Sequence, residues 1–208
     1  VVVLGDLFEV WVGDDLIGQS AFEDACVALL RASAESQPVY FMHGNRDFLA
    51  GPACMAATGM QLLPDPVVLE AFGQRWLLSH GDALCLDDTD YMAFRAEVRS
   101  AAWQAQFLGR PLSDRQAVAR QLREASKARQ RNGMMAYADV DTGAARDWLV
   151  AAGAQILVHG HTHRPGRHAL ASGLSRVVLS DWDARAVPPR LEVLRLSAQG
   201  LERRALTP

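Results

Sequence analysis

The 208-residue sequence lacks any long hydrophobic run, although half of its residues are apolar. A membrane-spanning helix needs about 20 apolar residues, and apolar stretches such as residues 1–4 and 25–30 are far shorter. The sequence also shows no basic segment followed by an apolar stretch and a small-residue cleavage site, which would mark a secretory signal. We therefore expect neither an integral membrane protein nor an exported one.

The sequence contains few cysteines, and its net charge is small. The three cysteines, Cys26, Cys54 and Cys85, form no CxxC pair, which is typical of free thiols in the cytoplasm. A net charge of −3 predicts no nucleic-acid partner. However, the stretch between Tyr91 and Gly133 carries nine basic and three acidic residues, a local charge of +6, so we expect it to favour an anionic partner.

Short apolar runs that end in polar residues recur along the chain, at residues 1–4, 39–42, 76–79 and 155–158. These runs predict strands. The ends of such strands converge at one edge of an α/β sheet, where ligands bind. The polar residues that follow them are oxygen and imidazole donors: Asp6, Asn45, His80, His161 and His163.

The rest of the sequence predicts helices and a second sheet. Helical spacing of apolar residues occurs at 21–34 and 144–152, and strands of a second sheet are predicted at 176–180 and 190–196. Residues 88–139 are expected to form an inserted helical cap of two helices, separated at residues 109–111. We expect one domain over residues 1–208 that carries this insertion.

The donor set predicts a metal site. Oxygen and nitrogen ligands without thiolate suit Mn²⁺, Fe²⁺ or Zn²⁺, and an aspartate can bridge two cations. Two cations roughly 3.5–4 Å apart can hold the attacking and leaving oxygens of a displacement and lower the pKa of a water, which is phosphoester chemistry. If residues 161–163 are extended, His161 and His163 point to the same side, and each could serve one cation.

Four longer motifs resemble those of the calcineurin-like metallophosphoesterases: GDLFEVWVGDD (5–15), HGNRDFLAG (43–51), HGDALCLDD (80–88) and HGHTHRP (159–165). The first is similar to the branch of that family that hydrolyses the pyrophosphate bond of a UDP-linked diacylglucosamine in lipid A biosynthesis. The resemblance implies an α/β fold, a four-layer αββα sandwich with an inserted helical cap. It also implies two Mn²⁺ per active site, a lipid-linked nucleotide substrate, and acyl chains that lie under the cap.

The resemblance also implies roles for individual residues. Asp6 would bridge the cations, Asn45, His80 and His161 would complete one site, and His163 would serve the other. Arg46 would act with Asn45 and His161 in catalysis and face the phosphates, where a guanidinium stabilises developing charge; an ordinary salt bridge is the alternative for Arg46.

Further positions match substrate contacts of the family: Asp88, Ser126 and Gln130. Two positions depart from the family, because an Asn is more familiar at Gln130 and a Lys at Gly133. Arg129 or Arg131 are alternative sources of the missing charge. The family's first motif, Asp-x-His, does not precede Val1, so we expect a truncated chain whose second cation is poorly held and whose activity is low.

Two other functions remain open. One is a phosphoesterase of the same family that acts on nucleotides or a phosphoprotein, and the other is a metal-free scaffold with the same fold. The Arg-rich helices, with Trp103, Phe107 and Leu108 nearby, could bind the anionic cytoplasmic surface of the inner membrane or form an ordinary solvated face. The oligomeric state stays open.

Overall fold

The structure, a computed structural model, describes residues 1–131, 138–171 and 173–206, without the side chains of 125–131 and 171. The chain divides into two units, each made of two segments. The first unit comprises Val1–Pro64 and Asp88–Ala138, and the second comprises Asp65–Asp87 and Asp139–Pro208.

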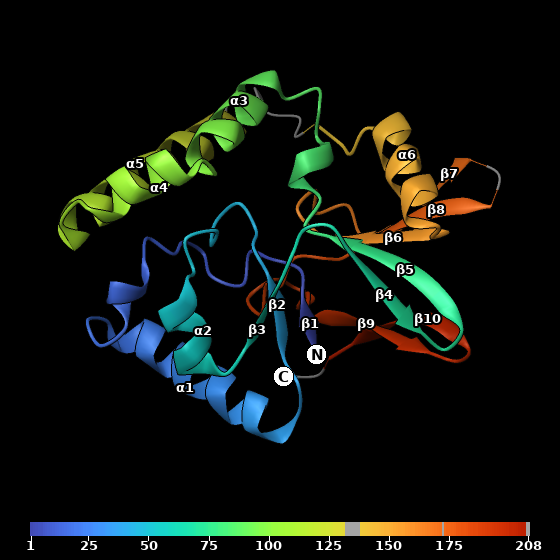
Figure 1. Cartoon of the computed structure of the whole chain (residues 1–208), viewed down its shortest axis with the longest axis horizontal. Helices are drawn as coiled ribbons and strands as arrows, with labels where there is room; N and C mark the ends of the chain where they lie inside the picture. The colour runs from blue at the N-terminus through green and yellow to red at the C-terminus, as the bar shows by residue number, and fades with distance from the viewer. Residues whose placement is uncertain (132–137, 172, 207–208) are drawn as a thin grey trace. The chain divides into compact units, whose positions relative to one another are not determined.

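The first unit contains a parallel three-stranded sheet in the order β1-β2-β3. Its strands are β1 (Val2–Val3), β2 (Tyr40–Met42) and β3 (Gln61–Leu63). The crossovers that parallel pairing requires are α1 (Ala21–Ser36) and α2 (Pro52–Thr58), and a short 3₁₀ turn, η1 (Asp14–Leu16), precedes α1 (Figure 1). Each strand therefore ends in a loop at the same edge of this sheet.

Residues 89–131 form three helices, α3 (Thr89–Val98), α4 (Ala101–Leu108) and α5 (Leu112–Arg131). The predicted break at 109–111 is confirmed, but the expectation of only two helices was wrong. A second break occurs because the Ser100 side chain caps α4 by accepting a hydrogen bond from the Trp103 N–H (3.2 Å).

Aromatic and aliphatic side chains from both segments build the core of the first unit. Phe107 of α4 packs among them, so the helical segment shares this core. The fully or nearly buried members are Phe8, Trp11, Val12, Leu16, Val27, Val39, Phe41, Leu49, Ala50, Cys54, Met60 and Phe107.

The second unit contains a five-stranded sheet in the order β4-β5-β6-β8-β7. The strands are β4 (Val67–Ala71), β5 (Gln74–Ser79), β6 (Ile156–His159), β7 (Gly166–Ala171) and β8 (Leu174–Val178). The central strands β5, β6 and β8 are parallel, and the outer strands are antiparallel to their neighbours. The unit also contains a 3₁₀ turn, η2 (Asp82–Leu84), helix α6 (Thr142–Ala152), and a hairpin of β9 (Glu192–Ser197) and β10 (Gly200–Ala205).

Two predictions about the sheets were wrong. The donor-bearing strands do not share one sheet, because β1 and β2 belong to the three-stranded sheet and β5 and β6 to the five-stranded one. The strands predicted at 176–180 and 190–196 do not share a second sheet: β8 lies between β6 and β7 in the five-stranded sheet, whereas β9 pairs with β10. Within the described ranges, no helix has the length and apolar character needed to cross a membrane.

Candidate active site

Asp6 lies in a tight loop that follows β1. Its backbone is left-handed (φ 54°), a conformation that Asp adopts more readily than most residues. The Asp6 Oδ1 accepts a hydrogen bond from the Arg46 backbone N–H (3.0 Å). A Cβ at Gly44 would lie 2.2 Å from this oxygen, so glycine is required for the loop after β2 to approach the carboxylate.

Asp47 has a fully buried side chain and belongs to the HGNRD motif, although it is not among the predicted site residues. Its carboxylate accepts hydrogen bonds from three backbone N–H groups, those of Leu7 (2.7 Å), Gly44 (2.8 Å) and Phe8 (3.4 Å). Asp47 therefore connects the loop that carries Asp6 with the loop that carries Asn45.

Arg46 follows the half-buried Asn45 and contacts two carboxylates. Its Nη1 lies 3.0 Å from Glu9 Oε2 and its Nε lies 3.4 Å from Asp6 Oδ2. Glu9 also pairs with Arg123 of α5 (2.9 Å). The salt bridge that was an alternative for Arg46 is thus present, and it holds the guanidinium beside Asp6.

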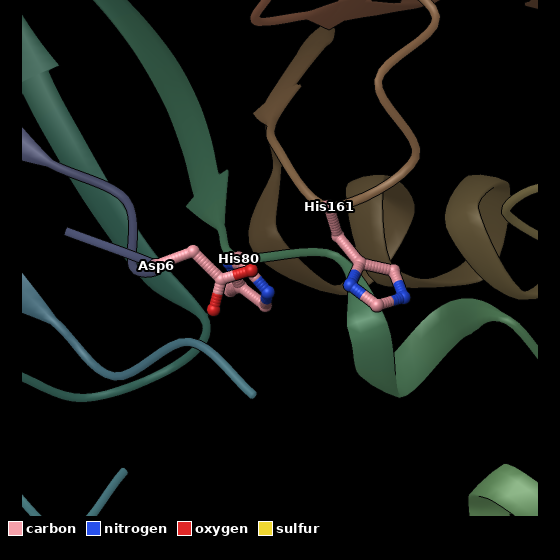
Figure 2. A group of neighbouring side chains, drawn as sticks. All are labelled: Asp6, His80 and His161. Carbon is pink, nitrogen blue, oxygen red and sulfur yellow. The ribbon is translucent and has the colours of Figure 1, made fainter. Parts of the chain in front are cut away.

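His80 and His161 come from neighbouring parallel strands of the second unit. His80 directly follows β5 and is 1% exposed, and His161 lies on the loop after β6 (Figure 2). Their ring centroids are 5.1 Å apart at an interplanar angle of 65°, and each ring has a nitrogen within 4.8 Å of one in the other. The Gly160 N–H donates to the His80 carbonyl (3.0 Å), which joins the two loops.

Two histidines of the 159–163 motif, His159 and His161, are held in the neutral form. Burial, and next the neighbouring His80, lower the pKa of His161 to about 3. Burial also lowers the pKa of His159 to about 4. Near pH 7 the His161 ring therefore has a lone pair available for a cation.

The extended conformation predicted for residues 161–163 was wrong. His161 and His163 both have left-handed backbones, with φ of 62° and 50°. The Thr162 N–H donates to the Gly160 carbonyl (2.7 Å), so the chain turns tightly here. The alternation that would place both rings on one side does not apply, and His163 is exposed.

The predicted substrate-contact residues lie in or next to the helical segment. Asp88 caps α3, because its Oδ1 accepts a hydrogen bond from the Tyr91 N–H (3.0 Å). Gly133 lies outside the described residues. Four residues lie on α5 with side chains outside the described part of the chain: Ser126, Arg129, Gln130 and Arg131.

The donors in each unit suit a divalent cation. The first unit offers the oxygens of Asp6 and Asn45, and the second offers the imidazoles of His80, His161 and His163. Oxygen and imidazole donors without thiolate match Mn²⁺, Fe²⁺ or Zn²⁺. The residues present therefore fit the cations that the sequence predicted.

Comparison with known proteins shows the family. The calcineurin-like phosphoesterase family matches residues 1–165. The chain belongs to this family. Membership confirms the predicted α/β fold class, and it identifies phosphoester hydrolysis with divalent metal as the chemistry of the domain.

Curated relatives match most of the chain. A UDP-2,3-diacylglucosamine hydrolase of Chromobacterium violaceum is 49% identical over 181 residues, 86% of this chain and 75% of its own length. A protein of the same name from Xanthomonas campestris is 46% identical over 210 residues, 96% of this chain and 82% of its own. The solved structure of an archaeal phosphodiesterase aligns with 92% of this chain and 79% of its own chain. Its sequence identity is 9% and its TM-score is 0.43, so this similarity carries no argument about function.

Proposed function

We propose that this protein hydrolyses the pyrophosphate bond of UDP-2,3-diacylglucosamine to UMP and 2,3-diacylglucosamine 1-phosphate, a step of lipid A biosynthesis. The observation that carries the proposal is the 49% identity with the Chromobacterium violaceum UDP-2,3-diacylglucosamine hydrolase. The four motifs that carry the site residues support it, since they lie on the loops that follow β1, β2, β5 and β6.

We further propose the ligands of two Mn²⁺ ions. Asp6 would bridge both, Asn45, His80 and His161 would complete one site, and His163 would belong to the other. Bound cations of this kind act as Lewis acids on a phosphoryl oxygen and lower the pKa of a bound water. The neutral His161 and the half-buried Asn45 and Asp6 are suitable donors for such ions.

Arg46 is proposed to bind the phosphate oxygens. Its guanidinium is held by Glu9 and Asp6, and the planar fork of Arg can offer several N–H donors to a phosphate. An incoming anion would take the place of the Glu9 carboxylate, which is half-exposed. Arg46 would then orient the phosphate and stabilise charge that develops on it.

The helical segment is proposed to receive the lipid. Trp103 and Phe107 of α4 stack with centroids 4.6 Å apart, and Phe48 lies 6.3 Å from Trp103. The half-buried Trp103 and Phe48 side chains would provide apolar surface for acyl chains, while Asp88, Ser126 and Gln130 would contact the polar part of the substrate. Since the substrate is a lipid, we propose peripheral association with the cytoplasmic face of the inner membrane through the basic helices. Phe107 is 5% exposed, so it would not insert into the membrane.

The test measures Mn²⁺-supported hydrolysis of UDP-2,3-diacylglucosamine and of a generic phosphodiester by the protein and by two variants, His80→Ala and Asn45→Ala. Each variant loses a cation ligand, so turnover is expected to fall by orders of magnitude. The melting temperature should stay close to that of the unaltered protein. His168→Ala is the matched control, because His168 contacts only the Arg164 carbonyl among the hydrogen bonds described (3.3 Å).

Near-normal turnover in either variant would contradict the cation site. Efficient hydrolysis of the generic phosphodiester, with none of the lipid nucleotide, would instead favour another phosphodiesterase of the same family.

A further inference from the structure

A buried imidazole, His159, belongs to the last residue of β6, directly before the loop that carries His161 and His163. It is fully buried at the end of β6. Its Nε2 lies 3.3 Å from Arg176 Nη1, and its Nδ1 lies 2.9 Å from the Gly160 carbonyl oxygen. Because a guanidinium can only donate, Nε2 must accept, and the ring proton is then on Nδ1 and donated to Gly160. Arg176 thus determines the tautomer of His159.

Arg176 is itself fixed by a carboxylate. It lies in β8, is 6% exposed, and donates two parallel hydrogen bonds to Asp139, each of 2.7 Å. Asp139 also accepts a hydrogen bond from the side chain of Arg164 (3.1 Å), the residue after His163. A bidentate pair of this kind restricts the orientation of the guanidinium more than a single contact would.

The backbone of Gly160 connects the loops of His80 and His161, two of the three histidines proposed as ligands. Its N–H donates to the His80 carbonyl, and its carbonyl accepts from His159 and from the Thr162 N–H. The next residue, His161, has a left-handed backbone. Such a conformation costs of order 1–3 kcal/mol and persists only where surrounding contacts hold it.

We propose that Asp139, Arg176 and His159 are positioning residues of the proposed cation site: they fix the Gly160 carbonyl and so hold His161 in the geometry needed to bind a divalent cation. The inference rests on the proposed function only for the identity of the cation ligands. Hydrogen-bonded partners behind metal ligands typically change metal affinity by 10–100-fold when they are removed.

The test is a titration of each variant with Mn²⁺ alone. Electron paramagnetic resonance measures the free Mn²⁺ at each step, and a thermal melt of the same sample gives the melting temperature. Arg176→Met and His159→Leu should each weaken Mn²⁺ binding by about 10–100-fold. His159→Asn should retain most of the affinity, because the Asn side-chain amide can place an N–H near the position of Nδ1. Arg204→Met is the control, since Arg204 lies on β10 and pairs with Glu202 at the surface.

A fourth variant separates positioning from stability. Arg176→Met combined with Asp139→Leu removes both charges of this partly buried pair, and an apolar replacement of a buried ion pair is often neutral for stability. We expect this double variant to recover the melting temperature lost in Arg176→Met but not the Mn²⁺ affinity.

The inference is overturned if Mn²⁺ affinity follows the melting temperature through the whole series, or if His159→Leu binds Mn²⁺ as tightly as His159→Asn. Absence of Mn²⁺ binding by the unaltered protein would overturn the cation site and this inference together. If the unaltered protein binds Mn²⁺ but does not hydrolyse UDP-2,3-diacylglucosamine, only the proposed substrate fails, and the affinity series still tests the positioning role.

Discussion

At the scale of single residues, Asp47 illustrates how one carboxylate organises two loops. It is fully buried and its two oxygens accept from backbone N–H groups of the loops after β1 and β2. Residues 4–13 and 43–51 belong to neither a helix nor a strand, so no regular backbone pairing fixes these loops and their conformation depends on such hydrogen bonds. Asp6 and Asn45 are held in position as a consequence.

We therefore predict a large effect of Asp47→Asn. The new amide group would turn two N–H donors toward backbone N–H groups that need acceptors, and the free energy of unfolding should fall by about 2–3 kcal/mol. Urea unfolding measures this, with Asp147→Asn as the control, because Asp147 is an exposed residue of α6. A fall no larger than in the control would show that the Asp47 carboxylate is dispensable.

At the scale of elements, Arg115 joins α5 to the loop before α1. It is 2% exposed, donates to the Val12 carbonyl and to the Arg110 carbonyl (3.0 Å), and forms a bidentate pair with Asp15. A Cβ at Gly13 would lie 2.3 Å from the guanidinium. The GDD motif thus contributes Gly13 and Asp15 to the attachment of a helix, and not to the proposed chemistry.

Arg115→Lys tests this attachment. A lysine keeps the charge, but its single ammonium group cannot reproduce the hydrogen bonds that the planar guanidinium donates to two carbonyls and a carboxylate. We therefore expect the free energy of unfolding to fall by about 2 kcal/mol. Arg120→Lys in the exposed part of the same helix is the matched control and should change little. Equal unfolding free energies for the two variants would contradict the role of Arg115.

At the scale of the whole molecule, charge is unevenly distributed. The stretch between Tyr91 and Gly133 has a net charge of +6 while the chain has −3, so the remainder is strongly negative. A cationic helical segment on an otherwise anionic protein is suited to attract an anionic lipid substrate.

Replacing Arg129 and Arg131 together by Glu should raise the KM for UDP-2,3-diacylglucosamine and leave hydrolysis of a small chromogenic phosphodiester much less affected. Steady-state kinetics on both substrates measures the difference. The control replaces Arg195 and Arg204 by Glu, which changes the net charge equally on the β9–β10 hairpin. Equal losses on both substrates would indicate a misfolded segment, and no loss on either would mean that Arg129 and Arg131 are ordinary surface charge.

Local sequence patterns were sufficient to locate the candidate donors. Apolar runs followed by Asp, Asn or His marked the ends of β1, β2, β5 and β6, and helix periodicity marked α1 and α6. Several other elements went unpredicted, because short segments carry too little periodicity to distinguish a strand or helix from a loop; these are α2, β3, β4, β7 and β10.

The sequence by itself determined which side chains are available for chemistry and that each follows a strand, because apolar alternation and turn residues are local properties. Only the tertiary structure decided which strands pair, since pairing partners lie far apart in the chain. It also decided that the 161–163 loop turns tightly and that Asp47, Arg115 and Arg176 are buried. Each of these three side chains is held by hydrogen bonds to residues 37–103 positions away in the sequence, and no local period encodes contacts of that range.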